Sequence, residues 1–186
     1  MSSLIIQNAH IINRSGATLS DLLIEDGIIA KIEKNIALCC DEKSIDARNY
    51  LVFPGGIDPH VHFKLPTPAG CSVDDFWSGS RAAIAGGSTY FMDFVTPRKG
   101  ESLKTALNHR LKEAEESLLD FDLHVGITWF DKSILDEMSW CVEEAGIKSF
   151  KVYLAYKGSI GLELWELEQV MQRAALLDAL VLVHCE

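Results

Sequence analysis

The first fifty residues alternate short apolar runs with polar turns. The runs are rich in Ile, Leu and Val and show no helical spacing, which is the pattern of short β-strands. Glu25-Asp26-Gly27, between two of these runs, is typical of a tight β-hairpin. The pattern therefore predicts a small β module whose strands lie at 4–6, 10–12, 22–24, 28–32 and 50–53.

From Pro54 onward the pattern changes to a repeated order of strand, loop and helix. The strand ends recur about every thirty residues, the length of a βα unit, and their continuous apolar runs suit parallel strands buried on both faces. We therefore divide the chain into residues 1–53 and 54–186. The second part predicts strands at 51–57, 89–95, 122–129, 149–153 and 179–184, and helices at 74–86, 101–119, 132–145 and 161–178.

Two α/β architectures use this order of elements. A doubly wound sheet often carries a glycine-rich phosphate-binding turn after its first strand, and no such motif appears here. A (β/α)₈ barrel gathers its chemistry at the carboxyl ends of its strands, which is where the polar residues fall. A complete barrel takes about 250 residues, so we expect an incomplete TIM-type barrel, either truncated relative to its working form or assembled with other copies.

The composition narrows the choice of partner. The formal net charge is −10 and no stretch clusters Lys and Arg, which argues against nucleic acid or an anionic membrane as a partner. A small neutral or polar substrate fits better. No apolar run approaches membrane-spanning length, and the first residues lack the basic start and apolar core of a signal peptide. We therefore expect a cytoplasmic protein.

The cysteines encode neither a disulfide framework nor a cysteine zinc site. They are odd in number and show no CxxC spacing. We expect them to be reduced and mostly to pack in the interior. They are Cys39, Cys40, Cys71, Cys141 and Cys185.

Histidines stand where two of the apolar strands end. His60 and His62 are two residues apart in an extended segment, so their side chains project to the same side and can share one metal ion. A structural histidine pair is the alternative, and the position at a strand end favours the metal. His184 closes another apolar run; alone it suits a capped core histidine, but a barrel mouth would bring it near the pair.

Lys151 is the unusual residue of its strand. A lysine in a strand buried on both faces needs a partner, a lowered pKa or a chemical modification, unless its ammonium reaches the strand end. Reaction with CO₂ would turn it into a carbamate that can bridge two metal ions. Tyr156 could direct its phenol into the barrel mouth as a hydrogen-bond donor, or simply pack.

Other polar residues have plainer interpretations. Asp58 and Asp93, near strand ends, are expected to cap turns or accept hydrogen bonds from loop amides. The helix expected at 101–119 carries charges of both signs and is interpreted as a solvated helix without a function. The loop 63–72 is expected to shape a pocket.

The stretch PGGIDPHVHF, residues 54–63, resembles the first-strand signature of the amidohydrolase superfamily. Three further stretches narrow the resemblance to its dihydropyrimidinase and hydantoinase branch: SVDDFWSGSRAAIAGGSTYFMDFVTP at 72–97, GIKSFKVYLAYKGS at 146–159 and LVLVHCE at 180–186. The resemblance covers nearly the whole chain. It implies a (β/α)₈ barrel joined to a β-sandwich built from both chain ends, with residues 1–53 as the amino-terminal part of the sandwich.

The resemblance also implies roles for five residues. His60 and His62 would hold one zinc ion, and Lys151, as N6-carboxylysine, would bridge it to a second. His184 would bind the second zinc, and Tyr156 would donate a hydrogen bond to the substrate carbonyl as it becomes an oxyanion. The implied reaction is attack by a metal-bridging hydroxide on a ring amide, opening dihydropyrimidines or hydantoins to N-carbamoyl amino acids, as in pyrimidine catabolism.

The resemblance also shows what this chain lacks. The family places another zinc-binding histidine, and an aspartate that binds metal and moves the proton, on later strands that are not present here. We therefore expect no hydrolysis from this polypeptide alone. By resemblance the assembly is a homotetramer. Scaffold proteins of the collapsin-response-mediator type, which lack the metal ligands, are the alternative; His60, His62, Lys151 and His184 argue against that class.

Overall fold

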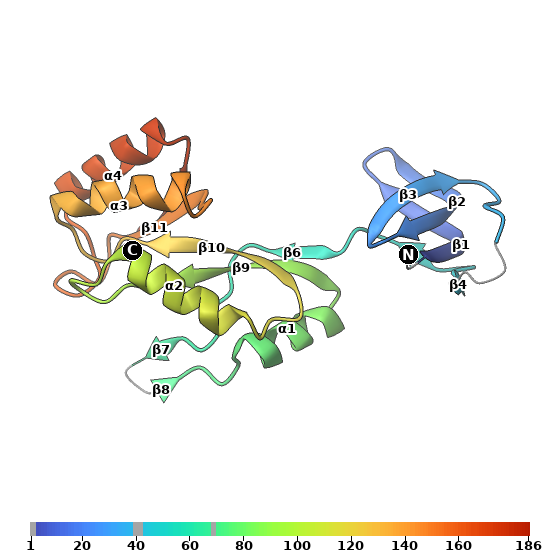
Figure 1. Ribbon diagram of the computed structural model, residues 1–186, viewed down its shortest axis with the longest axis horizontal. Coiled ribbons are helices and arrows are strands. Elements are labelled where there is room, and N and C mark those ends of the chain that lie inside the picture. The colour runs from blue at the N-terminus through green and yellow to red at the C-terminus, as the bar shows by residue number, and fades with distance from the viewer. Residues whose placement is uncertain (1–2, 39–42, 68–69) are drawn as a thin grey trace. The chain divides into compact units, whose positions relative to one another are not determined.

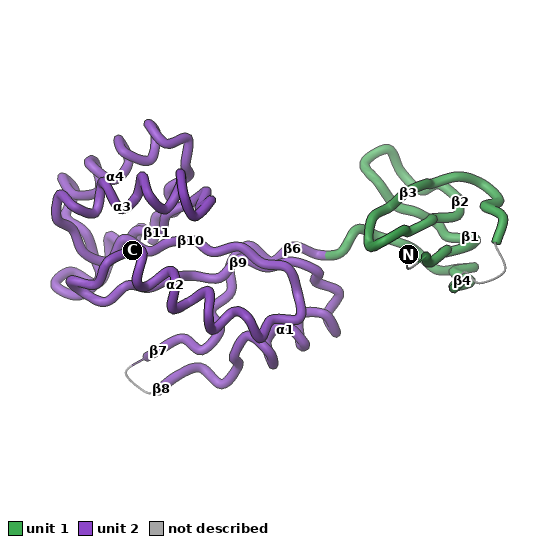
Figure 2. Tube along the Cα trace, in the orientation of Figure 1, with its two compact units in different colours: residues 1–55 green, residues 56–186 purple. Residues whose placement is uncertain are grey.

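The computed structural model describes residues 3–38, 43–67 and 70–186. The chain falls into two compact units, Met1–Gly55 and Gly56–Glu186 (Figure 2). Each unit has its own sheet and its own cluster of buried apolar side chains. The chemistry-bearing residues predicted from the sequence all lie in the second unit.

The first unit is a five-stranded sheet in which β1 is central. The order along the sheet is β3-β2-β1-β4, and β5 also pairs with β1. The β1–β2 and β2–β3 pairs are antiparallel, whereas β4 and β5 run parallel to β1. The strands are β1 (Ser3–Asn13), β2 (Gly16–Glu25), β3 (Ile28–Glu33), β4 (Lys43–Asp46) and β5 (Leu51–Val52).

Local backbone geometry explains one success and one error of prediction in this unit. Asp26 and Gly27 both have positive φ, 48° and 82°, and form the predicted two-residue hairpin turn between β2 and β3. The runs at 4–6 and 10–12 were expected to be separate strands, which is wrong, because both belong to β1. Asn8, with φ of 57°, shifts the register of β1 while its N–H donates to Asp21.

The second unit is an α/β fold with a parallel-strand half-barrel (Figure 1). Its five strands are hydrogen-bonded in chain order, which is the order that successive βα units produce. They are β6 (Gly56–Asp58), β9 (Ser88–Val95), β10 (Asp120–Gly126), β11 (Ser149–Tyr153) and β12 (Leu180–His184). The intervening helices are α1 (Phe76–Ala85), α2 (Leu103–Ala114), α3 (Lys132–Glu143) and α4 (Leu164–Leu176), and a small hairpin is formed by β7 (Pro66–Thr67) and β8 (Gly70–Cys71).

Capping residues make the helices shorter than their sequence patterns. The Asp75 side chain accepts a hydrogen bond from the Ser78 N–H and so caps the start of α1. The Ser102 side chain accepts one from the Thr105 N–H and caps the start of α2. The helix expected to reach residue 119 ends at Ala114. The strand expected at 51–57 is also wrong as one element, because it divides into β5 of the first unit and β6 of the second; Pro54, which has no N–H to donate, lies between them.

The main core of the second unit lies between the sheet and its helices. Val125 of β10, Phe150 and Val152 of β11 and Met138 of α3 are all fully buried there. Helix α2 packs against α3, and α3 against α4. Among the residues described, no helix is long and apolar enough to cross a membrane.

The cysteines only partly follow the prediction. Cys71, Cys141 and Cys185 are free thiols, but only Cys141 is buried in the core, whereas the other two are exposed. The expectation that most cysteines pack in the interior is therefore wrong for Cys71 and Cys185, which lie in the β7–β8 hairpin and directly after β12. Cys39 and Cys40 lie outside the described residues.

Candidate metal and catalytic site

The polar residues singled out from the sequence meet at the carboxyl end of the half-barrel. Asp58 ends β6, and the histidine pair begins two residues later. Lys151 lies within β11, and His184 is the last residue of β12, where it pairs with Tyr153 of β11. Because parallel strands end on the same side of their sheet, residues distant in the sequence are brought together.

The two histidines point their ring nitrogens at one another. The Nε2 atoms of His60 and His62 lie 3.2 Å apart. Both rings rest against Phe94 of β9, with centroid separations of 4.6 Å. Two ligands that each lie about 2.0–2.1 Å from a tetrahedral zinc ion are a little over 3 Å apart, so this pair fits one shared ion.

The surroundings favour the neutral form of both rings. Partial burial, followed by the electrostatic influence of the nearby Lys151 and His124, lowers the pKa of His60. Burial, followed by the neighbouring His60, lowers the pKa of His62. Since a metal ion binds the unprotonated nitrogen of imidazole, this electrostatic setting suits ligands.

Lys151 is buried without an anionic partner. It is 6% exposed, and among the residues described its ammonium makes no ion pair or hydrogen bond. Its Nζ lies 5.8 Å from the centroid of Phe94 and 5.5 Å from that of Tyr153. A carboxylate partner was one of the explanations that the sequence left open for Lys151. The described part of the chain provides no such partner.

His184 and Tyr156 form the other side of the site. The His184 ring lies 5.7 Å from that of Tyr156 and 5.9 Å from that of Tyr153. Its Nε2 is 3.2 Å from a carboxylate oxygen of Glu186. Tyr156 has a φ of 61° and is 54% exposed, so its phenol is available to a ligand rather than packed in the core.

Aromatic rings connect the five predicted residues into one cluster. Phe94 contacts the histidine pair and Lys151, and Tyr153 connects Lys151 to His184, which stacks on Tyr156. Within the described ranges, however, no three His, Cys, Asp or Glu side chains converge on a single point suited to a metal ion. The histidine pair is therefore the one preformed element of a metal site that these contacts define.

Asp93 and Arg110 were underestimated from the sequence. Asp93 accepts a hydrogen bond from the Phe63 N–H at 2.9 Å, and Asp58 accepts one from the His60 N–H at 3.1 Å, so both bind loop amides as predicted. Asp93 is also fully buried and forms an ion pair of 2.6 Å with Arg110.

Arg110 corrects the interpretation of its helix as merely solvated. Its side chain is 11% exposed and contacts the loop that carries the histidines. A signal was present in the sequence, because Arg110 lies on the apolar stripe of α2 with the buried residues Leu103, Ala106, Leu107 and Ala114.

His124 of β10 is a further residue that the sequence analysis missed. It is 4% exposed, and its Nε2 lies 3.1 Å from the carbonyl oxygen of Pro59, just before the histidine pair. A carbonyl oxygen only accepts hydrogen bonds, so Nε2 donates. Nδ1 lies 2.5 Å from the hydroxyl of Ser149. A histidine inside a continuous apolar run was the available signal.

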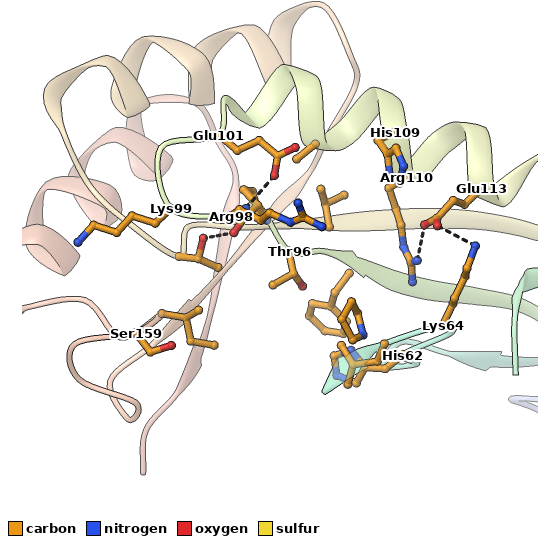
Figure 3. Close-up of a pocket in the computed structure, with 18 of the residues that line it drawn as sticks. His62, Lys64, Thr96, Arg98, Lys99, Glu101, His109, Arg110, Glu113 and Ser159 are labelled. Atoms are coloured by element: carbon orange, nitrogen blue, oxygen red, sulfur yellow. Dashed lines mark hydrogen bonds and ion pairs between the residues drawn. The ribbon is translucent and has the colours of Figure 1, made fainter. Parts of the chain in front are cut away.

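A cavity of about 760 Å³ opens beside His62. As expected, the loop 63–72 helps to shape it, through Lys64, Leu65, Pro66 and Cys71. The remaining walls come from residues 94–99, from Glu101, from α2, from Thr128 and from residues 158–160. Figure 3 shows Lys64 and Arg110 approaching Glu113, with which both form ion pairs.

The sequence is similar to dihydropyrimidinases and hydantoinases along nearly its whole length. It is 42% identical to the dihydropyrimidinase of Dictyostelium discoideum over 185 residues, which are 99% of this chain and 37% of that protein. It is 40% identical to the D-hydantoinase of Geobacillus stearothermophilus, an alignment that covers 98% of this chain and 39% of the relative. The chain thus spans about two fifths of the length of these relatives.

The fold is similar to that of solved hydantoinases. A crystal structure of D-hydantoinase superposes with a TM-score of 0.94 at 38% identity, over 99% of this chain and 40% of that one. A dihydropyrimidinase from Brevibacillus agri superposes with a TM-score of 0.94 at 33% identity, with the same coverage. The family model described as "Amidohydrolase family" matches residues 51–186, which include every strand of the half-barrel. The chain therefore belongs to the amidohydrolase family.

Proposed function

We propose that the protein is a zinc-dependent hydrolase that opens cyclic amides, either 5,6-dihydropyrimidines or hydantoins, to N-carbamoyl amino acids. The observation that carries the proposal is the pair of facing Nε2 atoms of His60 and His62, 3.2 Å apart at the carboxyl end of the half-barrel. The similarity to dihydropyrimidinases and D-hydantoinases supports the choice of substrate. Because the chain spans about two fifths of those relatives, the activity is proposed for a protein in which further strands complete the site.

The donor atoms fit zinc ions. His60 and His62 would hold one ion through neutral imidazole nitrogens, and Lys151, as N6-carboxylysine, would supply oxygens to both ions. His184 would serve the second ion once its ring is no longer held by Glu186, at 3.2 Å. When bound, the metal acts as a Lewis acid that polarises the substrate carbonyl and lowers the pKa of water.

Lys151 is proposed to act as the carbamate because of its surroundings. The Lys151 side chain packs among aromatic rings, and within the described ranges its ammonium has no carboxylate partner, an arrangement that costs free energy. Once the ammonium has lost a proton, addition of the Nζ lone pair to the carbon of CO₂, with loss of a second proton, converts the amine into an anion with two oxygen donors. An anion at that position matches the positive charge of metal ions.

Tyr156 is proposed to stabilise the oxyanion. Its phenol is exposed and its ring stacks on His184, so the hydroxyl can donate a hydrogen bond to a carbonyl oxygen held at the site. A donor that meets the oxygen as it becomes negative lowers the barrier to attack on the amide. Tyr156 and Lys151 are thus the residues to which we assign catalytic roles.

The architecture of the whole protein is also part of the proposal. We infer that residues 54–186 form the first half of a (β/α)₈ barrel and that residues 1–53 form the amino-terminal part of a β-sandwich. The chain-order pairing of the five parallel strands and the separate sheet of Met1–Gly55 support this division. We further propose a cytoplasmic homotetramer, on the basis of the resemblance alone.

The test is ring opening by the protein as its natural source produces it. We expect turnover of dihydrouracil or hydantoin that disappears after treatment with a chelator and returns with zinc. His60→Ala should lower turnover by about 100-fold or more, since it removes a metal ligand. His10→Ala, which alters an exposed histidine in the first unit, is the matched control and should leave turnover unchanged.

A metal-loaded protein with no turnover of any cyclic ureide would contradict the proposal. A protein that retains no zinc, shows no turnover and forms a stable tetramer would instead support the non-catalytic scaffold.

A further inference from the structure

We propose that Asp93 and Arg110 are positioning residues, which hold the histidine pair in its facing geometry by binding both polar backbone groups of Phe63. This inference rests on the proposed function, in that it assigns the pair to a metal ion. Within the described ranges Asp93 does not join the two histidines in a three-ligand group, and a guanidinium has no lone pair to offer a metal ion. Both residues act through the residue that follows His62.

The contacts form a closed set around one peptide segment. Asp93 accepts from the Phe63 N–H at 2.9 Å, and Arg110 donates to the Phe63 carbonyl oxygen at 2.6 Å. The same terminal nitrogen of Arg110 pairs with Asp93 at 2.6 Å. A terminal guanidinium nitrogen carries two hydrogens, so it can donate to the carboxylate and to the carbonyl oxygen together. The backbone on either side of Phe63 is therefore fixed by a strand and a helix at once.

The side chain of Phe63 is fixed as well. Its ring packs against Phe91 and Phe76, with centroid separations of 5.0 and 5.5 Å. It also lies over Gly79 of α1, where an added Cβ would be 2.2 Å from the ring. Phe63 thus has little freedom in its main chain or its side chain, and His62 is bonded directly to it.

The rest of the histidine loop is anchored in the same way. The Val61 N–H donates to the Met92 carbonyl oxygen at 3.0 Å, and His124 Nε2 donates to the Pro59 carbonyl oxygen. The residues between and beside the two histidines are therefore held by β9 and β10. Asp93 and Arg110 complete this set at its carboxyl end, on the His62 side.

The orientation of Arg110 supports a role in positioning. Its Nε is the one side-chain nitrogen or oxygen among the described residues that is buried without a hydrogen-bond partner. The guanidinium instead lies 4.5 Å from the Phe76 centroid and directs its terminal nitrogens at Asp93, Glu113 and the Phe63 carbonyl. Arg110 thus places its terminal nitrogens on Asp93, Glu113 and the histidine loop, although this orientation leaves its Nε–H without an acceptor.

The experiment compares Arg110→Lys and Arg110→Met with Arg81→Met in the 186-residue chain. Arg81 is an exposed arginine of α1 that stacks over Trp77, and it serves as the matched control. Zinc affinity is measured by competition with a chelator, at a temperature where near-ultraviolet circular dichroism shows each variant folded. In the zinc-free chain, the imidazole ¹⁵N shifts of His60 and His62 and the exchange rate of the Phe63 amide are also measured.

We expect both Arg110 variants to bind zinc about 10-fold more weakly or worse, as is typical when a group that orients a ligand is lost. The imidazole shifts should change and the Phe63 amide should exchange faster, while Arg81→Met matches the parent chain. Arg110→Lys keeps a cation beside Asp93, so it tests the position if Arg110→Met fails to fold. Folded Arg110 variants with the parent's zinc affinity, shifts and amide exchange would overturn the inference but leave the proposed function standing.

If the parent chain itself binds no zinc at the pair, the metal assignment fails instead. The shifts and the Phe63 exchange rate then decide the positioning role alone, and unchanged values would overturn it.

Discussion

The two sides of the candidate site are built differently. On the His60–His62 side, a fully buried carboxylate, a nearly buried arginine and a buried histidine hold the loop through its backbone. On the His184 side, the polar side chain that contacts the imidazole is the carboxylate of Glu186, which is 80% exposed. His184 ends β12, which in the described part of the sheet pairs with β11 alone.

The difference indicates where the geometry is already determined. The histidine pair depends on contacts among β6, β9, β10 and α2, all of which this chain contains. His184 depends on a strand at the edge of the sheet, where Leu180 is 72% exposed. The His60–His62 side is therefore preorganised by contacts within the chain itself. On the other side, His184 is positioned only by the pairing of β12 with β11 and by its contacts with aromatic rings.

Asp93→Ala should break the preorganised side with the largest effect. It leaves Arg110 buried beside Phe76 without its closest anion, and the loss of one partner of a buried ion pair costs about 3–5 kcal/mol. The measurement is the free energy of unfolding from urea titration. Glu186→Ala, on the His184 side, is the control and should change the free energy of unfolding by less than about 0.5 kcal/mol. Equal effects of the two substitutions would refute the contrast between the sides.

His124→Ala should have an intermediate effect. It removes the donor to the Pro59 carbonyl and the partner of the Ser149 hydroxyl, and it leaves a cavity against Phe94. Unsatisfied buried polar groups cost about 1–3 kcal/mol each. Thermal unfolding measures the loss of stability, with His184→Ala as the matched histidine substitution on the His184 side. A His184→Ala variant that is less stable than His124→Ala would reverse the comparison.

Glu113→Gln should have the smallest effect, and that effect should depend on pH. Burial alone would raise the pKa of Glu113, but hydrogen bonds from Arg110 and Lys64 hold it below its ordinary value of 4.5. A lowered pKa in the folded state means that the charged form stabilises the fold above pH 4.5 and that this stability is lost as pH falls through the folded pKa.

Because Glu113 and Lys64 are partly exposed, the difference between parent and variant should stay below about 1 kcal/mol at neutral pH. It should shrink towards zero in acid. Urea titrations at several pH values measure it, and a difference that grows as pH falls would contradict this account.

Local patterns predicted the elements well but not the contacts between them. The strand expected at 149–153 matches β11, in which Phe150, Val152 and Tyr153 supply bulky side chains typical of strands. The pairing of His60 with His62 followed from two-residue spacing at a strand end, and the rings do lie together.

The ion pair of Asp93 with Arg110 joins a strand to a helix 17 residues later in the chain. The sequence analysis expected Asp93 only to bind loop amides or cap a turn, and expected the helix of Arg110 only to be solvated. The left-handed Asn8 that joins two predicted strands into β1 was likewise invisible to hydrophobic spacing. Packing decides both, and packing depends on partners that a local window does not contain.

The most direct test of the account is diffraction at the zinc absorption edge from crystals of this chain grown with saturating zinc. We predict an anomalous peak between the Nε2 atoms of His60 and His62, about 2.0–2.1 Å from each. A structure in which the two rings stay in contact with each other and zinc is absent, or binds only elsewhere on the chain, would contradict the central claim that this pair is a preformed metal site.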